Sequence, residues 1–238
     1  MDFATALADE NRAFVELVFA NDLATQVPTC PGWALKQLYR HVGGGDRWAA
    51  QIVGDRMADR LDFADIRDGR APQDPDEARA WVAGGPAQLI DAVAAVGPDT
   101  SVWTFLGLRP AQWWIRRRLH EVLVHRADAA LAVGAAFEPS PELAADAVSE
   151  WLDIAIARGG IDGTLHLHAT DDGLGERGEW TVAGNGWSHS HGKGDAALRG
   201  PATDLLLALT RRTTVAGTPI ELFGDQAVWD SWLAATPF

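Results

Sequence analysis

The sequence predicts an α+β protein, in which an N-terminal up-and-down four-helix bundle precedes a smaller C-terminal α+β domain. Three observations lead to this fold class. Apolar residues recur at helical spacing in four segments before Gly134. Residues 164–170 alternate between apolar and polar, as in a strand. Gly159-Gly160 separates the helical part of the sequence from the strand-like part. We therefore expect two domains, one of residues 1–158 and one of residues 159–238.

The helices of the predicted bundle are bounded by polar or proline-containing stretches, which end a helix by removing its hydrogen bonds or its apolar face. The Gly84-Gly-Pro86 triplet predicts a kink in the third helix. The predicted helices span residues 3–21, 34–53, 76–96 and 110–133, and a further helix at 142–158 completes the first domain.

Beyond residue 160 the chain is predicted to form short strands and two helices. Asn185-Gly186 between two apolar runs is a strong signal for a β-hairpin. The predicted strands span residues 164–170, 179–183, 186–190, 197–200 and 219–223, and the helices span 201–212 and 225–233.

Composition excludes several classes of protein. The 238 residues include 33 acidic and 20 basic ones, a net charge of −13, and such a surface repels nucleic acid. No segment is apolar enough to cross a membrane, and the N-terminus lacks the pattern of a signal peptide, so we expect a cytoplasmic protein without a membrane partner. Cys30 is the only cysteine, which excludes an internal disulfide. We interpret it as a packed small residue, with a nucleophile as the alternative.

Residues 116–128 place two imidazoles and several charges inside a predicted core helix. His120 and His125 are five apart, which sets them about 140° apart around a helix, so one unbroken helix cannot give both to one metal. Glu121 and His125 share a face and form a carboxylate–imidazole pair that needs another ligand. Asp128 either orients His125, pairs with an arginine or forms a surface salt bridge.

His41 lies within the apolar stripe of the second predicted helix, three residues after Leu38. It is either a core histidine satisfied by a hydrogen bond or a further ligand for the Glu121/His125 pair. Gly43-Gly-Gly45 follows it, at a cost of about 1 kcal/mol per glycine in a helix. The glycines indicate close helix approach, room for a ligand, or a local break.

Histidines also recur at i, i+2 spacing in the second domain, which puts each pair on one face of a strand. They lie either on the wet face of an exposed sheet or in a second metal site. These residues are His166, His168, His189 and His191.

Three motifs carry a family resemblance. They are W-x-L-x-x-L-x-x-H from Trp33 to His41, H-E-x-x-x-H-R-x-D from His120 to Asp128, and the stretch 198–212 followed by Phe223-Gly-Asp225. In this order they resemble the mycothiol-dependent maleylpyruvate isomerase family, and the bundle resembles the wider DinB-like metal-binding superfamily.

The resemblance implies a divalent metal, usually zinc, held by His41, Glu121 and His125, with mycothiol supplying its thiol to that metal. It also implies an essential arginine in the second domain, for which Arg212 is the best match and Arg211 lies one place away. Two imidazoles and one carboxylate leave open positions, the catalytic pattern for zinc, although nickel, cobalt or iron also suit this set.

The expected activity is therefore maleylpyruvate isomerase-like. A small electrophilic carboxylate would undergo cis–trans isomerisation by addition and elimination of a thiolate. The alternatives are a mycothiol S-transferase, a non-catalytic metal-stabilised module that binds a ligand, and a bundle in which His41 and His125 are merely core histidines. The expected partners are a small molecule and a low-molecular-weight thiol, in a monomer or small homo-oligomer.

Overall fold

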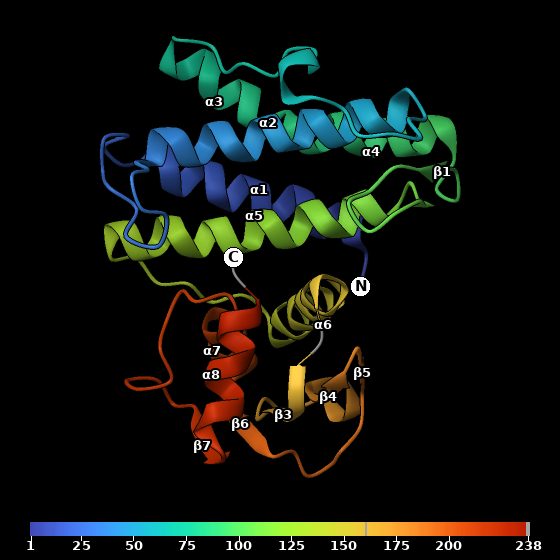
Figure 1. Cartoon of the computed structure of the whole chain (residues 1–238). Coiled ribbons are helices and arrows are strands. Elements are labelled where there is room, and N and C mark those ends of the chain that lie inside the picture. Colours follow the sequence, from blue (N-terminus) through green and yellow to red (C-terminus); the bar gives the residue numbers. More distant parts are fainter. Residues whose placement is uncertain (160, 237–238) are drawn as a thin grey trace. The chain divides into compact units, whose positions relative to one another are not determined.

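Long helices lie side by side in the N-terminal part of the computed structural model (Figure 1), which describes residues 1–159 and 161–236. Asp2 caps the first of them by accepting hydrogen bonds from Ala4 and Thr5, and Gly134 ends the last in a left-handed conformation that suits glycine. The helices are α1 (Phe3–Phe19), α2 (Leu35–Gly54), α3 (Pro75–Ala83), α4 (Gly85–Val96) and α5 (Trp113–Val133), with a short 3-10 helix η1 (Phe63–Asp65).

The chain divides into two units, Met1–Phe137 and Glu138–Phe238. The helical first unit and the mixed second unit confirm the predicted α+β class with two domains. Among the described residues, no helix combines the length and the hydrophobicity that spanning a bilayer requires.

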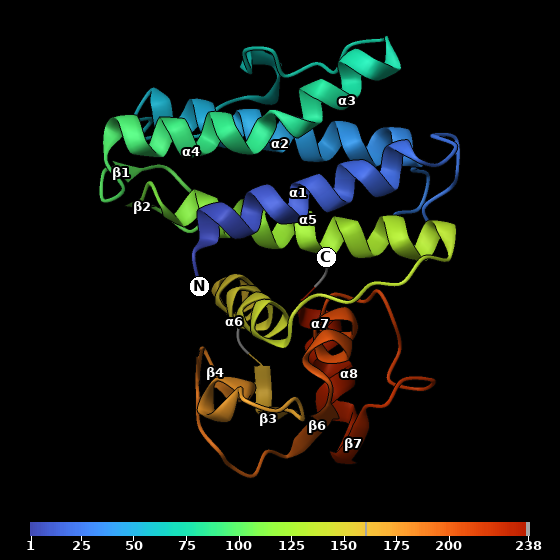
Figure 2. The same ribbon diagram turned by 180° about the vertical axis from the view of Figure 1, so that it is seen from behind.

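The directions of the bundle helices differ from the predicted up-and-down order. Gly85 approaches Asp46, and Gly54 approaches Ala92, so α2 and α4 run parallel (Figure 2). Helices α1 and α5 are also parallel, since Arg126 binds Glu10 nearer their C-terminal ends and Arg116 lies over Phe3 at the start of α1. The long connection of residues 55–74 returns the chain between α2 and α3, a crossover that an up-and-down bundle lacks.

Two helix boundaries in the first unit also differ from prediction. The third predicted helix is divided at Gly84 into α3 and α4, consistent with the expected kink there. The fourth begins at Trp113 instead of residue 110, because Pro110 belongs to a short antiparallel pair of strands. These strands are β1 (Ser101–Val102) and β2 (Arg109–Pro110).

The second unit is built on a sheet with the strand order β5-β4-β3-β6-β7. Only the β3–β6 pair is parallel among these neighbours, and the predicted hairpin is confirmed by the pairing of Ala183 with Gly186. Leu165, Leu167 and Trp180 are buried on one face, and α7 and α8 both contact β3. The elements are α6 (Pro141–Arg158), β3 (Ile161–Ala169), η2 (Gly175–Gly178), β4 (Glu179–Gly184), β5 (Gly186–Ser188), β6 (Ala196–Gly200), α7 (Ala202–Leu209), β7 (Glu221–Gly224) and α8 (Gln226–Ala235).

Helix α6 belongs to the second unit, whereas the predicted boundary of 158/159 placed it in the first. It packs against α7, and Trp180 of β4 donates a hydrogen bond to Ser149 at 2.9 Å. Trp187 of β5 donates another to Asp153 at 2.9 Å. These contacts connect α6 to the sheet, so the structural division falls before it, between Phe137 and Glu138.

Candidate metal centre

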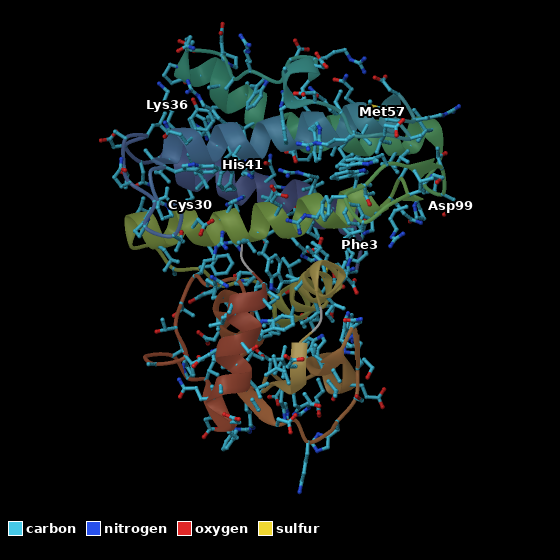
Figure 3. All side chains as sticks on the ribbon, viewed as in Figure 1. Phe3, Cys30, Lys36, His41, Met57 and Asp99 are labelled. Atoms are coloured by element: carbon cyan, nitrogen blue, oxygen red, sulfur yellow. The ribbon has the colours of Figure 1, made fainter. Side chains whose placement is uncertain are left out.

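The packing of α2 against α5 brings His41, Glu121 and His125 together. Each offers one ligand atom, and these atoms all lie within 4.8 Å of one another. His41 projects from α2, shortly after the loop that holds Cys30 (Figure 3). Glu121 and His125 lie one helical turn apart on α5, so their spacing of four residues places both on the face that meets α2.

The exposure of the three side chains decreases from His41 to His125, toward the interior of the bundle. His41 Nε2 lies 2.9 Å from Glu121 Oε1, and the His41 and His125 rings meet edge to face at a centroid distance of 4.9 Å. The exposed side-chain fraction falls from 40% at His41 to 18% at Glu121 and 5% at His125. The site therefore opens to solvent on the His41 side, where the Trp33 ring also lies against the imidazole.

Two arginines on α5 hold the Glu121 carboxylate. Arg118 Nη1 lies 2.9 Å from Oε1, and Arg117 Nη2 donates to Oε2 at 3.0 Å. Burial alone raises the pKa of Glu121, but the charges of Arg118 and Arg117 and the hydrogen bond with His41 outweigh it. The pKa of Glu121 is therefore well below its usual value, and the side chain is anionic at neutral pH.

Arg118 is itself fixed from α2. Its Nε donates to Asp46 Oδ1 at 2.8 Å, and its Nη2 donates to the carbonyl of Val42 at 2.9 Å. The guanidinium fits because Gly45 has no side chain, since a Cβ there would lie 2.5 Å from Arg118 Nη1. Helix α2 runs unbroken through the three glycines, so close approach is the correct interpretation of the glycine run at Gly45.

Asp128 orients the imidazole of His125. Its Oδ2 lies 2.8 Å from His125 Nδ1, and its Oδ1 accepts a hydrogen bond from Thr29 at 2.5 Å. Asp128 is fully buried, which excludes the surface salt bridge. Because Nδ1 is engaged, Nε2 is the nitrogen that His125 can present to a metal. Burial lowers the pKa of His125, and the Asp128 hydrogen bond offsets only part of this, so the imidazole is neutral at pH 7.

Cys30 lies beside this arrangement, with its Sγ 3.6 Å from Asp128 Oδ2. Cys30, His125 and Asp128 form a second possible ligand group that shares His125 with the first. In that group, Asp128 Oδ2 already bonds to His125 Nδ1. The group with Glu121 and His41 fits a divalent metal better, because it combines an ionised carboxylate, a neutral imidazole and an open side.

The other predicted residues lie elsewhere. His120 is buried on α5 and belongs to no ligand group among the described residues, consistent with its place on another face. Arg211 and Arg212 follow α7 in the second unit and line a pocket of about 860 Å³. Arg212 is buried and donates to the carbonyl of Thr210 at 2.7 Å, whereas Arg211 is exposed with a positive φ of 63°.

Sequence reasoning missed the roles of Asp46, Arg118 and Thr29. The sequence offered one signal for the first two, namely charged residues at positions that the helical periodicity places in the core. No local pattern indicated Thr29, which is 99 residues from its partner Asp128.

Comparisons with known proteins agree with this architecture. The family model of the mycothiol maleylpyruvate isomerase N-terminal domain matches residues 4–130, and that of the MDMPI C-terminal domain matches residues 142–231. No curated protein sequence matches the chain.

Two solved structures share the fold. The crystal structure of the mycothiol-dependent maleylpyruvate isomerase is similar with a TM-score of 0.66 and 15% identity, over 93% of this chain and 91% of that chain. A histidine-to-alanine mutant of that enzyme gives a TM-score of 0.65 and 14% identity over the same shares.

Proposed function

The chain belongs to the mycothiol maleylpyruvate isomerase family, and from this premise we propose that it is a metal- and mycothiol-dependent enzyme acting on a small electrophilic carboxylate. In the proposed reaction, the thiolate sulfur bonds to one carbon of a cis double bond. The π electrons move onto the conjugated carbonyl as an enolate, and rotation about the resulting single bond follows. The enolate pair then re-forms the double bond and cleaves the C–S bond, which releases the trans isomer and the thiolate. The reaction needs no net oxidant or reductant.

The observation that carries this proposal is the convergence of His41, Glu121 and His125 inside the family's N-terminal domain. Two imidazoles and one carboxylate make a site for a catalytic divalent metal, for which zinc is the proposed ion. Such a metal, when bound, would keep a thiol deprotonated near neutral pH. Nickel, cobalt or iron would also suit these ligands.

The chain's own residues prepare this site before any ligand arrives. Arg117 and Arg118 keep Glu121 ionised, and Asp128 holds His125 with Nδ1 engaged. The exposed edge at His41 is the side from which the thiol and the substrate would enter. The buried side excludes water from His125.

A substrate carboxylate would be bound by Arg211 or Arg212. Both line the pocket that follows α7, and a guanidinium can hold a carboxylate through two parallel hydrogen bonds. Arg212 already uses Nη1 to hold its own turn through Thr210, whereas Arg211 is exposed. Separate alanine variants, compared by the KM for the carboxylate substrate, identify which arginine binds it.

The test of the proposed function compares His125→Ala with His120→Gln. His120→Gln is the matched control, because it changes a histidine on the same helix outside the ligand group. Metal content of the bundle site is measured by elemental analysis, and turnover is measured with maleylpyruvate-like electrophiles in the presence and absence of mycothiol. We expect His125→Ala to lose both the metal of this site and the thiol-dependent activity, and His120→Gln to keep both.

Two results would argue against this function. Wild-type protein purified without chelator that holds no metal at this site contradicts the metal-dependent reaction. Activity that is independent of thiol contradicts the addition–elimination route. The mass of the product separates the remaining alternative, since a stable thiol adduct indicates an S-transferase and an unchanged substrate mass indicates an isomerase.

A further inference from the structure

A second cluster of metal-ligating side chains lies on the sheet of the second unit. His166 and His168 alternate along β3 and share a face, opposite to the face of the buried Leu165 and Leu167. Glu179 of β4 is the register partner of His168, so its side chain lies on the same face as the two imidazoles. Neighbouring strands thus contribute two histidines and one carboxylate to a single patch.

An irregular segment, residues 189–194, adds a third histidine to this patch. It follows β5 and is held to β4 by two hydrogen bonds, from Thr181 Oγ1 to the carbonyl of Ser190 at 3.0 Å and from His189 Nδ1 to the carbonyl of Glu179 at 2.9 Å. His191 is thereby placed next to the Glu179 carboxylate. The cluster therefore draws its side chains from β3, β4 and the segment before β6.

The ligand atoms of this cluster are close enough to surround one cation. Glu179 Oε2 lies 2.6 Å from His191 Nδ1 and 3.2 Å from His166 Nε2, and one ligand atom of each residue lies within 4.8 Å of the others. A zinc ion binds nitrogen and oxygen ligands at about 2.0–2.2 Å, so small side-chain rotations suffice to enclose one. The ring of His168 lies 6.2 Å from that of His166 and 6.4 Å from that of His191.

The cluster differs from an ordinary solvated charge pair in the burial of its members. The side chain of His166 is 7% exposed and that of Glu179 is 19% exposed, whereas His191 is 78% exposed. A buried imidazole and a largely buried carboxylate form the floor of the site, and the exposed His191 closes it from the solvent side. Because His191 is exposed, an ion can reach the site from solvent.

We propose that His166, Glu179 and His191 form a second divalent-metal site, with the imidazole of His168 next to it. Two imidazoles and one carboxylate, with a third imidazole nearby, favour zinc, nickel or copper(II) over magnesium or calcium, which prefer sets made entirely of oxygen ligands. A metal bound there ties residues 189–194 to β3 and β4, because it links His191 to ligands on both strands. This site is independent of the proposed reaction at the bundle.

The test counts zinc ions in the full chain, with the bundle site removed by His125→Ala so that only the second site is measured. Protein is loaded with zinc, desalted and analysed for metal, and far-UV circular dichroism confirms the fold. We expect one ion per chain in His125→Ala and none when His191→Ala is added. The exposure of His191 makes that second change compatible with folding.

A pair of carboxylate variants provides the matched control. In the His125→Ala background, Glu179→Gln should lose the ion, whereas Glu176→Gln, three residues earlier and exposed, should keep it. Cobalt(II) should give d–d absorption bands in Glu176→Gln that are absent in Glu179→Gln. The proposal is overturned by His125→Ala protein that holds no ion, or by an ion that persists after His191→Ala or Glu179→Gln. Wild-type protein with one ion that is lost on His191→Ala supports this site while counting against the bundle site.

Discussion

Glu121 is the residue at which the charges of the bundle meet. Its carboxylate lies within 3.0 Å of His41, Arg117 and Arg118, so it stays ionised without a metal. A carboxylate with these partners has its orientation set in advance, which reduces the conformational entropy lost on metal binding. Asp46 offsets the charge of Arg118 at 2.8 Å, and this limits the repulsion that a cation would meet.

Asp128 should affect metal affinity without touching the metal. Asp128→Asn removes the negative charge that lies against His125 Nδ1 and that accepts the hydrogen bond from Thr29. The imidazole of His125 is then held less firmly. We expect zinc affinity at the bundle site to fall by about 10- to 100-fold, the usual effect of removing a partner of a metal ligand. Competition with a chromophoric chelator measures it, in the Glu179→Gln background to exclude the second site.

Glu10→Gln is the control for this change. It also converts a half-buried carboxylate to an amide in the same unit, and the partner of Glu10, Arg126, adjoins His125 in sequence. We expect its zinc affinity to equal that of the parent protein. Equal losses in the two variants would mean that Asp128 acts through general stability, not through the orientation of His125.

The sequence singled out the three residues that the structure brings together, but not the residues that position them. Glu121 and His125 share one helix face, and a family motif singled out His41, so local spacing and resemblance sufficed. Arg118 and its partner Asp46 are 72 residues apart in the sequence, and Cys30 and Asp128 are 98 apart. The spacing of residues within one helix cannot predict such pairings. They depend on which helices pack together and in which direction.

At the scale of elements, the glycine run of α2 controls how closely its neighbours approach. A Cβ at Gly43 would collide with the Trp81 ring, and one at Gly45 would collide with the Arg118 guanidinium. Gly44 differs, because its nearest atom would be the carbonyl oxygen of Gly69 at an ordinary 3.6 Å. Adjacent glycines in one helix therefore have opposite tolerance for a side chain.

This contrast gives a pair of stability predictions. Gly45→Ala should destabilise the protein by about 1–3 kcal/mol, the usual cost of overpacking, because Asp46 and Glu121 prevent Arg118 from moving away. Gly44→Ala should stabilise it by about 0.5–1 kcal/mol, because alanine has less backbone freedom than glycine in the unfolded chain and its Cβ meets no clash in the folded one. Urea unfolding of both variants measures the change in free energy. A Gly45→Ala protein as stable as Gly44→Ala would show that the Arg118 position is adaptable.

The identity of the elements was predicted better than their directions. Periodicity placed the long helices, and the Asn185-Gly186 dipeptide placed the hairpin, because both signals are local. It gave no information on whether residues 55–74 make a turn or a crossover, because a surface segment of that length permits either path. The bundle was therefore predicted with α2 and α4 antiparallel, and the structure shows them parallel.

At the scale of the whole molecule, the division of the chain can be tested with fragments. Residues 138–238 should fold alone, because they retain α6 with its packing on α7 and its hydrogen bonds to Trp180 and Trp187. Residues 159–238 should not fold alone, because without α6 the buried Trp180 would lose its hydrogen bond to Ser149. Cooperative unfolding followed by tryptophan fluorescence distinguishes a folded fragment. Equal cooperativity in the two fragments would support the shorter domain.

The pairing of α1 with α5, which are far apart in the sequence, also determines when the bundle can form during translation. Glu10 and Arg126 are 116 residues apart, and His41 and Glu121 are 80 apart. At about 5–20 residues per second, roughly 6 to 23 seconds separate the synthesis of Glu10 from that of Arg126. During this interval the apolar face of α1 has no α5 to cover it, so the nascent chain depends on slow, non-local closure. The proposed metal ligands, split between α2 and α5, come together only after that closure, so a nascent chain that ends before α5 should not retain zinc in its bundle.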